Sequence, residues 1–293
     1  MSSREGIPWS RPLFRWAGSK RSILPLLLNC VPNSYRRYVE PFAGSACLFF
    51  ALKPPCATLG DFNADLMHAY GVIAQHPRLI ARGIKSQPVR SKHYYAIRAL
   101  KPDTLDDVSR AIRFAYLNRY CFNGVYRTNR KNEFNVPRGS HLARVPSEAE
   151  IVRCAIALRG ADLSVGDFET TLQKASSKDF VYLDPPYSTA TRPTLGEYGY
   201  GSFSEVDDDR LINRVNSLSK AGVQVLLSYA YNRKIIAALR GWSVVSVPVR
   251  RQIAGGSKNT STFEILASNF SDLDRITDSA DILCRRTNKS RNS

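Results

Sequence analysis

Four consecutive residues combine a carboxylate, two rigid rings and an aromatic face: Asp184, Pro185, Pro186 and Tyr187. They follow the apolar run 180–183, which predicts a buried strand of a parallel sheet, and open α/β sheets bind ligands at the carboxyl ends of such strands. Because prolines lack N–H groups and an ionised carboxylate only accepts, the turn is rich in hydrogen-bond acceptors. This pattern favours a nucleobase whose exocyclic amine donates two hydrogen bonds and whose ring meets Tyr187. A simple turn capped by Asp184 is the alternative interpretation.

A second candidate site lies upstream, where residues 38–46 predict a short strand followed by a loop of small residues around Gly44. A helix begins near Cys47, so the order is that of a nucleotide-binding βα unit, and small residues let a ligand approach the backbone. The next strand, 57–60, ends at Asp61. An acid at this place in such a unit usually holds a pair of ribose hydroxyls. The alternative is that Asp61 caps the following helix.

The turn 14–20 places an aromatic plane, Trp16, and a cation, Lys20, on either side of a bend at Gly18 and Ser19. This pair could line a pocket. A core tryptophan beside a solvated lysine is the alternative.

Basic residues gather between positions 110 and 145, where eight Lys/Arg stand against one acid, Glu133. Asparagines and aromatic residues alternate with them, and Asn123-Gly124 predicts a tight turn. Arg and Asn are the side chains that pair with guanine and adenine edges, so the segment indicates a nucleic-acid contact rather than only a solvated face. The eight basic residues are Arg110, Arg113, Arg119, Arg127, Arg130, Lys131, Arg138 and Arg144.

The composition supports the same partner. The chain has 293 residues, of which 43% are hydrophobic, and a net charge of +17, which favours phosphate binding over a small-molecule enzyme. The six cysteines form no C-x-x-C pair and the four histidines lack metal-ligand spacing, so we expect free thiols, a reducing compartment and no metal. The first apolar run, 23–31, is too short to span a membrane. We expect a soluble, cytoplasmic monomer.

Strand and helix patterns alternate outside a polar helical stretch from about 76 to 118, which predicts an α/β fold. Residues 188–204 lack periodicity and predict a lid over the tetrad, residues 250–258 predict a flexible basic hairpin tip, and the tail from 271 is polar. Further strands are expected at 161–165, 223–228, 242–249 and 263–267, and helices at 21–30, 207–221 and 233–239.

Together these motifs resemble the Dam-type (D12 class) DNA adenine-N6 methyltransferases over residues 12–270. The resemblance rests on six motifs in the family's order, with the cofactor loop first and the tetrad last, which is the family's α arrangement. They are F-R-W-A-G-S-K, V-E-P-F-A-G-S, D-F-N-A-D-L, L-N-R-Y-C-F-N-G-V-Y-R, E-F-N-V-P and D-P-P-Y.

The resemblance implies a Rossmann-like methyltransferase sheet with helices on both faces and an inserted, mainly helical DNA-recognition domain. The catalytic domain would comprise residues 1–71 and 151–270, the insert 72–150, and a flexible tail 271–293. The methyl donor would be S-adenosylmethionine and the partner double-stranded DNA. Matching cofactor positions are Trp16, Lys20, Phe42, Gly44, Asp61 and Asp184; matching DNA positions are Arg15, Asn123, Val125, Arg127, Arg130 and Pro137.

The implied chemistry is methyl transfer to N6 of an adenine flipped out of the duplex. Asp184 and the Pro185 carbonyl would accept the two N6 hydrogens, and Tyr187 would stack on the base. Two positions depart from the family: Ala46 replaces a common glycine, and Arg15 replaces a lysine.

The best-known members of the family methylate the sequence GATC. Alternatives are another DNA site paired with a restriction nuclease, RNA, cytosine N4, or a catalytically silent DNA-binding protein.

Overall fold

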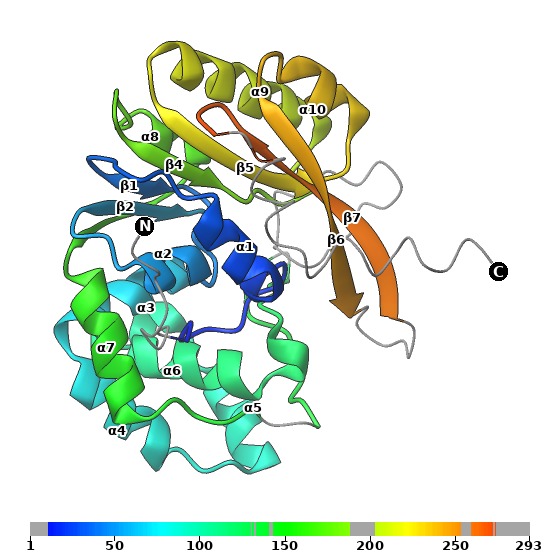
Figure 1. Cartoon of the computed structure of the whole chain (residues 1–293). Coiled ribbons are helices and arrows are strands. Elements are labelled where there is room, and N and C mark those ends of the chain that lie inside the picture. The colour runs from blue at the N-terminus through cyan, green and yellow to red at the C-terminus, as the bar shows by residue number, and fades with distance from the viewer. Residues whose placement is uncertain are drawn as a thin grey trace.

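A computed structural model describes residues 11–129, 131, 133–140, 143–187, 203–252, 259–271 and 273. Seven strands form one mixed sheet in the order β3-β2-β1-β4-β5-β7-β6 (Figure 1). All neighbours pair in parallel except β7, which is antiparallel to both β5 and β6. The strands are β1 (Tyr38–Glu40), β2 (Ala57–Asp61), β3 (Ala161–Val165), β4 (Phe180–Leu183), β5 (Gln224–Ala230), β6 (Ser243–Gln252) and β7 (Asn259–Ser268).

Side chains alternate between the two faces along each strand, so the central strands contribute to one core on each face of the sheet. In β4, Phe180 and Tyr182 join one core, whereas Val181 and Leu183 join another. The first core is covered by α1 (Leu24–Asn29), α2 (Cys47–Leu52) and α3 (Ala64–Gln75). The second is covered by α8 (Phe168–Leu172), α9 (Glu205–Lys220) and α10 (Arg233–Ala238) (Figure 1). The structure is thus an α/β fold consistent with the expected Rossmann-like methyltransferase sheet.

A helical body lies between β2 and β3 in the sequence and beside α3 in space (Figure 1). Its inner helices share the core of the sheet, since Ile80 and Phe114 belong to it. Its outer part has a smaller core of its own, centred on Tyr94 and Tyr116 and reaching Phe134. The body comprises α4 (Pro77–Ser86), α5 (Ser91–Ala99), η2 (Pro102–Thr104), α6 (Asp107–Tyr120), η3 (Phe122–Gly124) and α7 (Glu148–Leu158).

The expected elements occur with shifted ends. The expected helix 21–30 is divided into η1 (Lys20–Ile23) and α1, with Pro25 in the first turn of α1. Strands β6 and β7 are longer than expected because their ladder runs from Ser243↔Ser268 to Gln252↔Asn259, through polar residues that carry no apolar signal. Much of the predicted lid (188–202), hairpin tip (253–258) and tail (272 and 274–293) lies outside the described residues. Leu273 is buried, and its N–H donates to Ser243 Oγ.

Candidate active site at the carboxyl edge of the sheet

The tetrad follows β4, which is fully buried and lies between β1 and β5. The register places Asp184 beyond the end of β1, where Val39 pairs with Val181, and beside β5, where Leu183 pairs with Leu227; this carboxyl edge is where open α/β sheets bind ligands. Pro185 is buried, whereas Asp184, Pro186 and Tyr187 are partly exposed. The backbone is thus fixed from beneath while the carboxylate and the ring can meet a ligand.

Lys20 lies at the centre of this edge and is only 4% exposed. Its Nζ lies 2.8 Å from Asp184 Oδ1 and 3.5 Å from Glu264 Oε2. Nζ also donates to Tyr187 Oη at 2.8 Å and to the Gly18 carbonyl at 3.1 Å. A buried ammonium group requires such partners. The alternative of a solvated Lys20 is therefore wrong.

Sequence reasoning missed Glu264, which comes from β7 and is 3% exposed. It pairs in register with Ala230 of β5, so its side chain enters the site from a strand distant in sequence. An acid within the apolar run 263–267 was the available signal, since buried acids need a partner.

Tyr187 is fixed by contacts on two sides. Its ring packs edge-on against Tyr229, with ring centroids 5.2 Å apart and an interplanar angle of 75°. Lys20 Nζ lies 5.2 Å from the centroid of the Tyr187 ring. The aromatic group that the sequence places beside the carboxylate is therefore held there by packing and by a charge.

Asp61 lies at the end of β2 and accepts hydrogen bonds from the Gly44 and Asn63 N–H groups, both at 2.8 Å. Burial raises the pKa of its carboxyl from 3.8 to about 6, although these two hydrogen bonds oppose the shift. The N-cap of α3 is Asn63, whose Oδ1 accepts from Leu66 N at 2.9 Å. The capping alternative for Asp61 is therefore wrong, and its carboxylate instead ties the end of β2 to the glycine loop.

The glycine loop approaches Trp16 too closely for a side chain. A Cβ at Gly44 would lie 2.6 Å from Trp16 Cδ1, and Gly44 has φ +46°. Trp16 also stacks on Tyr126, with centroids 5.8 Å apart and planes at 21°. Trp16 thus connects the cofactor-type loop to the helical body.

Ala46 adopts the left-handed conformation, with φ 48° and ψ 40°, directly before α2. This conformation favours glycine because an L-residue's Cβ crowds the following carbonyl. The departure from the family's glycine therefore has a structural consequence, which is strain in a fully buried residue.

Glu40 is a second acid that sequence reasoning did not single out. It ends β1, is 2% exposed, and accepts a hydrogen bond from Tyr38 Oη at 2.9 Å. Burial raises its pKa well above the usual value, and the charges of Asp184 and Asp61 act in the same direction. Its place in V-E-P-F, at the end of an otherwise apolar strand, was the available signal.

Three phenylalanines pack together as an aromatic wall: Phe42, Phe168 and Phe203. Phe42 stacks on Phe168 at 5.3 Å and 28°. Phe203 packs against Phe42 at 5.9 Å and against Phe168 at 6.0 Å. Gly166 N donates to the Asp61 carbonyl at 3.0 Å, so the wall is joined to the end of β2.

The expected DNA-reading residues fall on two adjacent segments. Phe122 N donates to the Pro137 carbonyl at 2.9 Å, which brings Asn123 and Val125 beside Pro137. Asn123 and Pro137 are exposed, and Val125 is partly exposed. Asn123 and the following glycine both have positive φ, which confirms the tight turn.

Arg127 and Arg15 each contact one of these two segments. Arg127 Nε donates to Asn135 Oδ1 at 3.0 Å. A Cβ at Gly124 would lie 2.6 Å from Arg15 Nε, so Arg15 lies directly against the turn. Its Nη1 is buried and has no hydrogen-bond partner among the residues that the structure describes. Arg130 lies outside those residues.

Part of the basic cluster does not face a partner. Arg113 is 6% exposed and donates to two backbone carbonyls of α5. Arg119 donates to the Leu13 carbonyl at 2.6 Å, and Arg110 pairs with Asp65 at 2.7 Å. These three arginines therefore make contacts within the fold, so the number of basic residues in the segment overstates the charge available to a nucleic acid.

Asn118 is also internal. It is 1% exposed, accepts from Arg15 N at 2.9 Å and donates to the Arg15 carbonyl at 2.7 Å. Its amide orients Arg15 and cannot read a base edge.

Within the described ranges, no group of three or more His, Cys, Asp or Glu side chains could hold a metal ion. No helix in this part of the chain is long and apolar enough to cross a membrane.

Comparisons with known proteins point to the same family as the sequence motifs. A model of the D12 class N6 adenine-specific DNA methyltransferases matches residues 16–253. The type II methyltransferase M1.LlaDCHI of Lactococcus lactis subsp. cremoris is 32% identical over 273 residues, covering 89% of this chain and 95% of that protein. The type II methyltransferase M.MjaIII of Methanocaldococcus jannaschii is 29% identical over 286 residues, covering 89% and 99%. A DNA adenine methylase of Vibrio cholerae is 29% identical over 264 residues, covering 88% and 95%.

Proposed function

Because this chain belongs to the D12 class of N6 adenine-specific DNA methyltransferases, we propose that it transfers a methyl group from S-adenosylmethionine to N6 of a flipped adenine in GATC. The observation that carries the proposal is the meeting of three features on one sheet edge. These are the Asp184 tetrad after β4, the loop around Gly44 after β1, and Asp61 at the end of β2.

The residues of this edge fit the methyl donor. The lack of a Cβ at Gly44 lets Trp16 pack directly against the loop, and the Gly44 N–H donates to Asp61. A carboxylate has about four acceptor sites, so the two backbone hydrogen bonds to Asp61 leave capacity for ribose hydroxyls. Trp16, Lys20 and Phe42 complete the proposed cofactor positions. Bound S-adenosylmethionine supplies an electrophilic methyl group on a sulfonium.

Adenine N6 is a weak nucleophile because its lone pair is delocalised into the ring. In our proposal Asp184 and the Pro185 carbonyl accept the two N6 hydrogens, which leaves the lone pair directed at the methyl group. The ion pair with Lys20 is compatible with this role, because it occupies one of several acceptor sites on Asp184. The rate gain comes from positioning and fixed charges, while Pro186 keeps the turn rigid and Tyr187 stacks on the base.

Residues 72–150, which include most of the helical body, are proposed as the DNA-recognition domain. Asn123 and Pro137 are exposed and Val125 is partly exposed, and the three lie on neighbouring segments. Val125 and Pro137 are assigned to the thymine methyl group. Arg15 and Arg127 are assigned to the two guanines, since arginine pairs bidentately with guanine O6 and N7. Arg130 is assigned to phosphate. A monomer acting on double-stranded DNA suffices for this arrangement.

Two measurements test the proposal. Methylation of duplexes in which each base of GATC is varied in turn, at fixed salt, should show strong preference for GATC. Asp184→Ala should lower kcat by about a hundredfold or more while DNA affinity stays within about twofold, because the carboxylate acts on N6 and not on phosphates. Asp184→Ala activity within a few-fold of wild type would contradict the chemistry, and equal modification of another site would contradict the target.

A second candidate is modification of a different recognition site as half of a restriction-modification pair. Two of the relatives are type II methyltransferases, which favours this alternative over action on RNA. Long-read sequencing of DNA from cells expressing the chain distinguishes the candidates, because it reports base, position and context together.

A further inference from the structure

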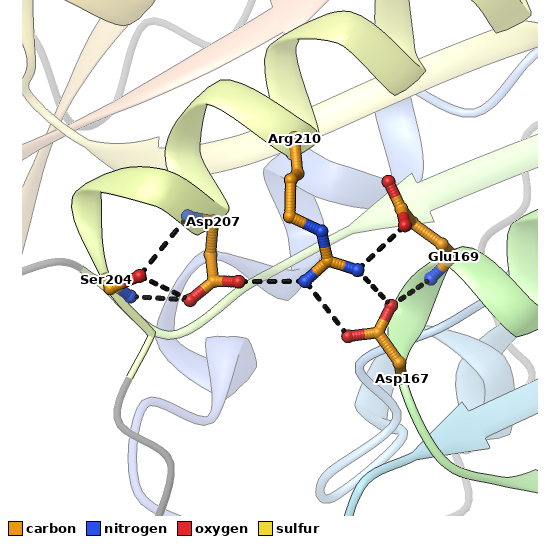
Figure 2. Close-up of polar contacts among 5 residues, drawn as sticks. All are labelled: Asp167, Glu169, Ser204, Asp207 and Arg210. Atoms are coloured by element: carbon orange, nitrogen blue, oxygen red, sulfur yellow. Dashed lines mark hydrogen bonds and ion pairs between the residues drawn. The ribbon is translucent and has the colours of Figure 1, made fainter.

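Arg210, in the first half of α9, donates to three carboxylates from two segments of the chain (Figure 2). Its Nη2 lies 2.7 Å from both Asp167 Oδ1 and Glu169 Oε2. Its Nη1 lies 2.9 Å from Asp207 Oδ1 and 3.2 Å from Asp167 Oδ2. The guanidinium carbon also lies 4.9 Å from the centroid of the Phe168 ring. One side chain therefore fixes four others.

These carboxylates belong to the starts of two helices. Asp167 caps α8 by accepting from Glu169 N at 3.0 Å. Asp207 accepts from Ser204 N at 2.9 Å and from Ser204 Oγ at 2.7 Å (Figure 2). Burial alone would raise the pKa of Asp207, but the hydrogen bonds from Ser204 and Arg210 hold it below its usual value. Arg210 thus ties the start of α8 to the start of α9.

The same two helix starts carry the aromatic wall. Phe168 is the first residue of α8, and Phe203 directly precedes the cap of α9. Both rings pack on Phe42 of the glycine loop. Any separation of the helix starts would therefore move Phe168 and Phe203 relative to Phe42 and the glycine loop.

The ion pairs of this cluster are too exposed to water to contribute much to the stability of the whole protein. Arg210 is 35% exposed, and its acidic partners are 42%, 38% and 25% exposed. Ion pairs this accessible to water contribute little individually. Without the guanidinium, however, three carboxylates would face one another, and their repulsion would spread the two helix starts. The expected effect is local and falls on the wall.

We propose that Arg210 is a positioning residue for the cofactor pocket: it holds the aromatic wall against the glycine loop and so sets the affinity for S-adenosylmethionine without contacting it. This inference rests on the proposed function, because it takes the wall and Asp61 to border the cofactor.

The test compares Arg210→Met, which keeps the apolar stem, with Arg210→Lys, which keeps the charge but not the planar fork. The matched control is Lys234→Met, which breaks the 2.6 Å pair between Lys234 of α10 and Asp209 of α9, the helix that also carries Arg210. Each variant is titrated with S-adenosylmethionine by calorimetry and with duplex DNA by anisotropy. Its KM for the donor, kcat and thermal midpoint are also measured.

We expect Arg210→Met to raise the Kd and KM for S-adenosylmethionine about fivefold or more, with kcat at saturating donor, DNA affinity and thermal midpoint matching the control. Arg210→Lys should fall between wild type and Arg210→Met, and it decides the question should Arg210→Met not fold. The inference is overturned by unchanged donor affinity in both variants, or by equal losses of donor affinity, DNA affinity and thermal midpoint. Absence of donor binding by the wild type would instead refute the proposed function, and this inference with it.

Discussion

Lys20 Nζ lies 2.8 Å from Asp184 Oδ1, and the same ammonium group is 3.5 Å from Glu264 Oε2. One buried cation therefore stands between two acids that come from β7 and from the end of β4. The arrangement keeps the Asp184 carboxylate directly next to a positive charge. It also makes the shape of the tetrad depend on a residue near the start of the chain.

Lys20→Met should be strongly destabilising, because it leaves two carboxylates without their cation. Removing one partner of a buried ion pair costs about 3–5 kcal/mol, and we expect a loss of that size in the free energy of unfolding in urea at pH 7. The double variant Lys20→Met/Glu264→Gln should recover at least about 1 kcal/mol, since one carboxylate is then neutral. A loss below about 1 kcal/mol, or no recovery, would show that the cluster is not electrostatically coupled.

Asp61 should make donor binding depend on pH. Its pKa is raised by burial to about 6, and only the ionised carboxylate accepts hydrogen bonds from both ribose hydroxyls. The Kd for S-adenosylmethionine should therefore rise about tenfold between pH 7 and pH 5, as calorimetry in matched buffers can measure. Asp61→Ala should bind weakly and without this pH dependence; a wild-type Kd that stays constant over the range would contradict the assignment.

The raised pKa of Asp61 also determines how the free energy of unfolding changes with pH. Because the folded-state pKa of Asp61 lies above its ordinary value of 3.8, the folded protein binds more protons between those two values. The contribution of Asp61 to the free energy of unfolding is therefore most favourable below about pH 4 and decreases as pH rises towards 6. The ionised form of Asp61 therefore lowers the free energy of unfolding, and binding of the methyl donor can offset that loss.

Ala46→Gly should stabilise the protein. The left-handed conformation of Ala46 costs an L-residue about 1–2 kcal/mol, and the greater freedom of glycine in the unfolded chain offsets about 0.4–1 kcal/mol of that gain. We expect a net increase of up to about 1.6 kcal/mol in the free energy of unfolding. Ala51→Gly, within α2, is the control and should lower it by about 1 kcal/mol. If both substitutions destabilise equally, Ala46 is not strained.

The sequence predicted those parts of the site whose signal is local. The apolar run before Asp184 and the small-residue loop at Gly44 each sit on a single strand end, and β4 occurs at 180–183 as expected. Glu264 could not be predicted in the same way, because its contact with Lys20 depends on how β7 enters the sheet. Side-chain pairing between distant strands is a property of the packed fold and leaves no local pattern.

The density of basic residues was a less reliable predictor of site residues than the sequence motifs were. Arg113 and Arg119 increase the basic density of the segment, yet both donate to backbone carbonyls inside the fold. Composition counts a charge without saying which way its side chain points. The motif containing Asn123 and Arg127, in contrast, identified a turn that the structure places beside Pro137.

Arg127 provides the sharpest test of target recognition. Its Nε hydrogen bond to Asn135 holds the guanidinium in place before any base is met, and a bidentate arginine–guanine pair discriminates by about 1–3 kcal/mol. Arg127→Ala should therefore relax specificity at one base pair of GATC, by about tenfold or more in kcat/KM for the substituted duplex relative to GATC. Asn135→Ala should act in the same direction but less strongly, because it frees Arg127 without removing it.

The control is Arg130→Ala. The sequence assigns Arg130 to phosphate, and a lost phosphate contact weakens binding to all sequences alike and reduces the salt dependence of the affinity by about one unit of slope. The measurement is methylation of duplexes with each base of GATC varied in turn, at two fixed salt concentrations. If Arg127→Ala loses activity evenly across all duplexes while Arg130→Ala changes their ranking, the roles of the two arginines are the reverse of those assigned. Arg130 would then make the base contact, and Arg127 the contact with phosphate.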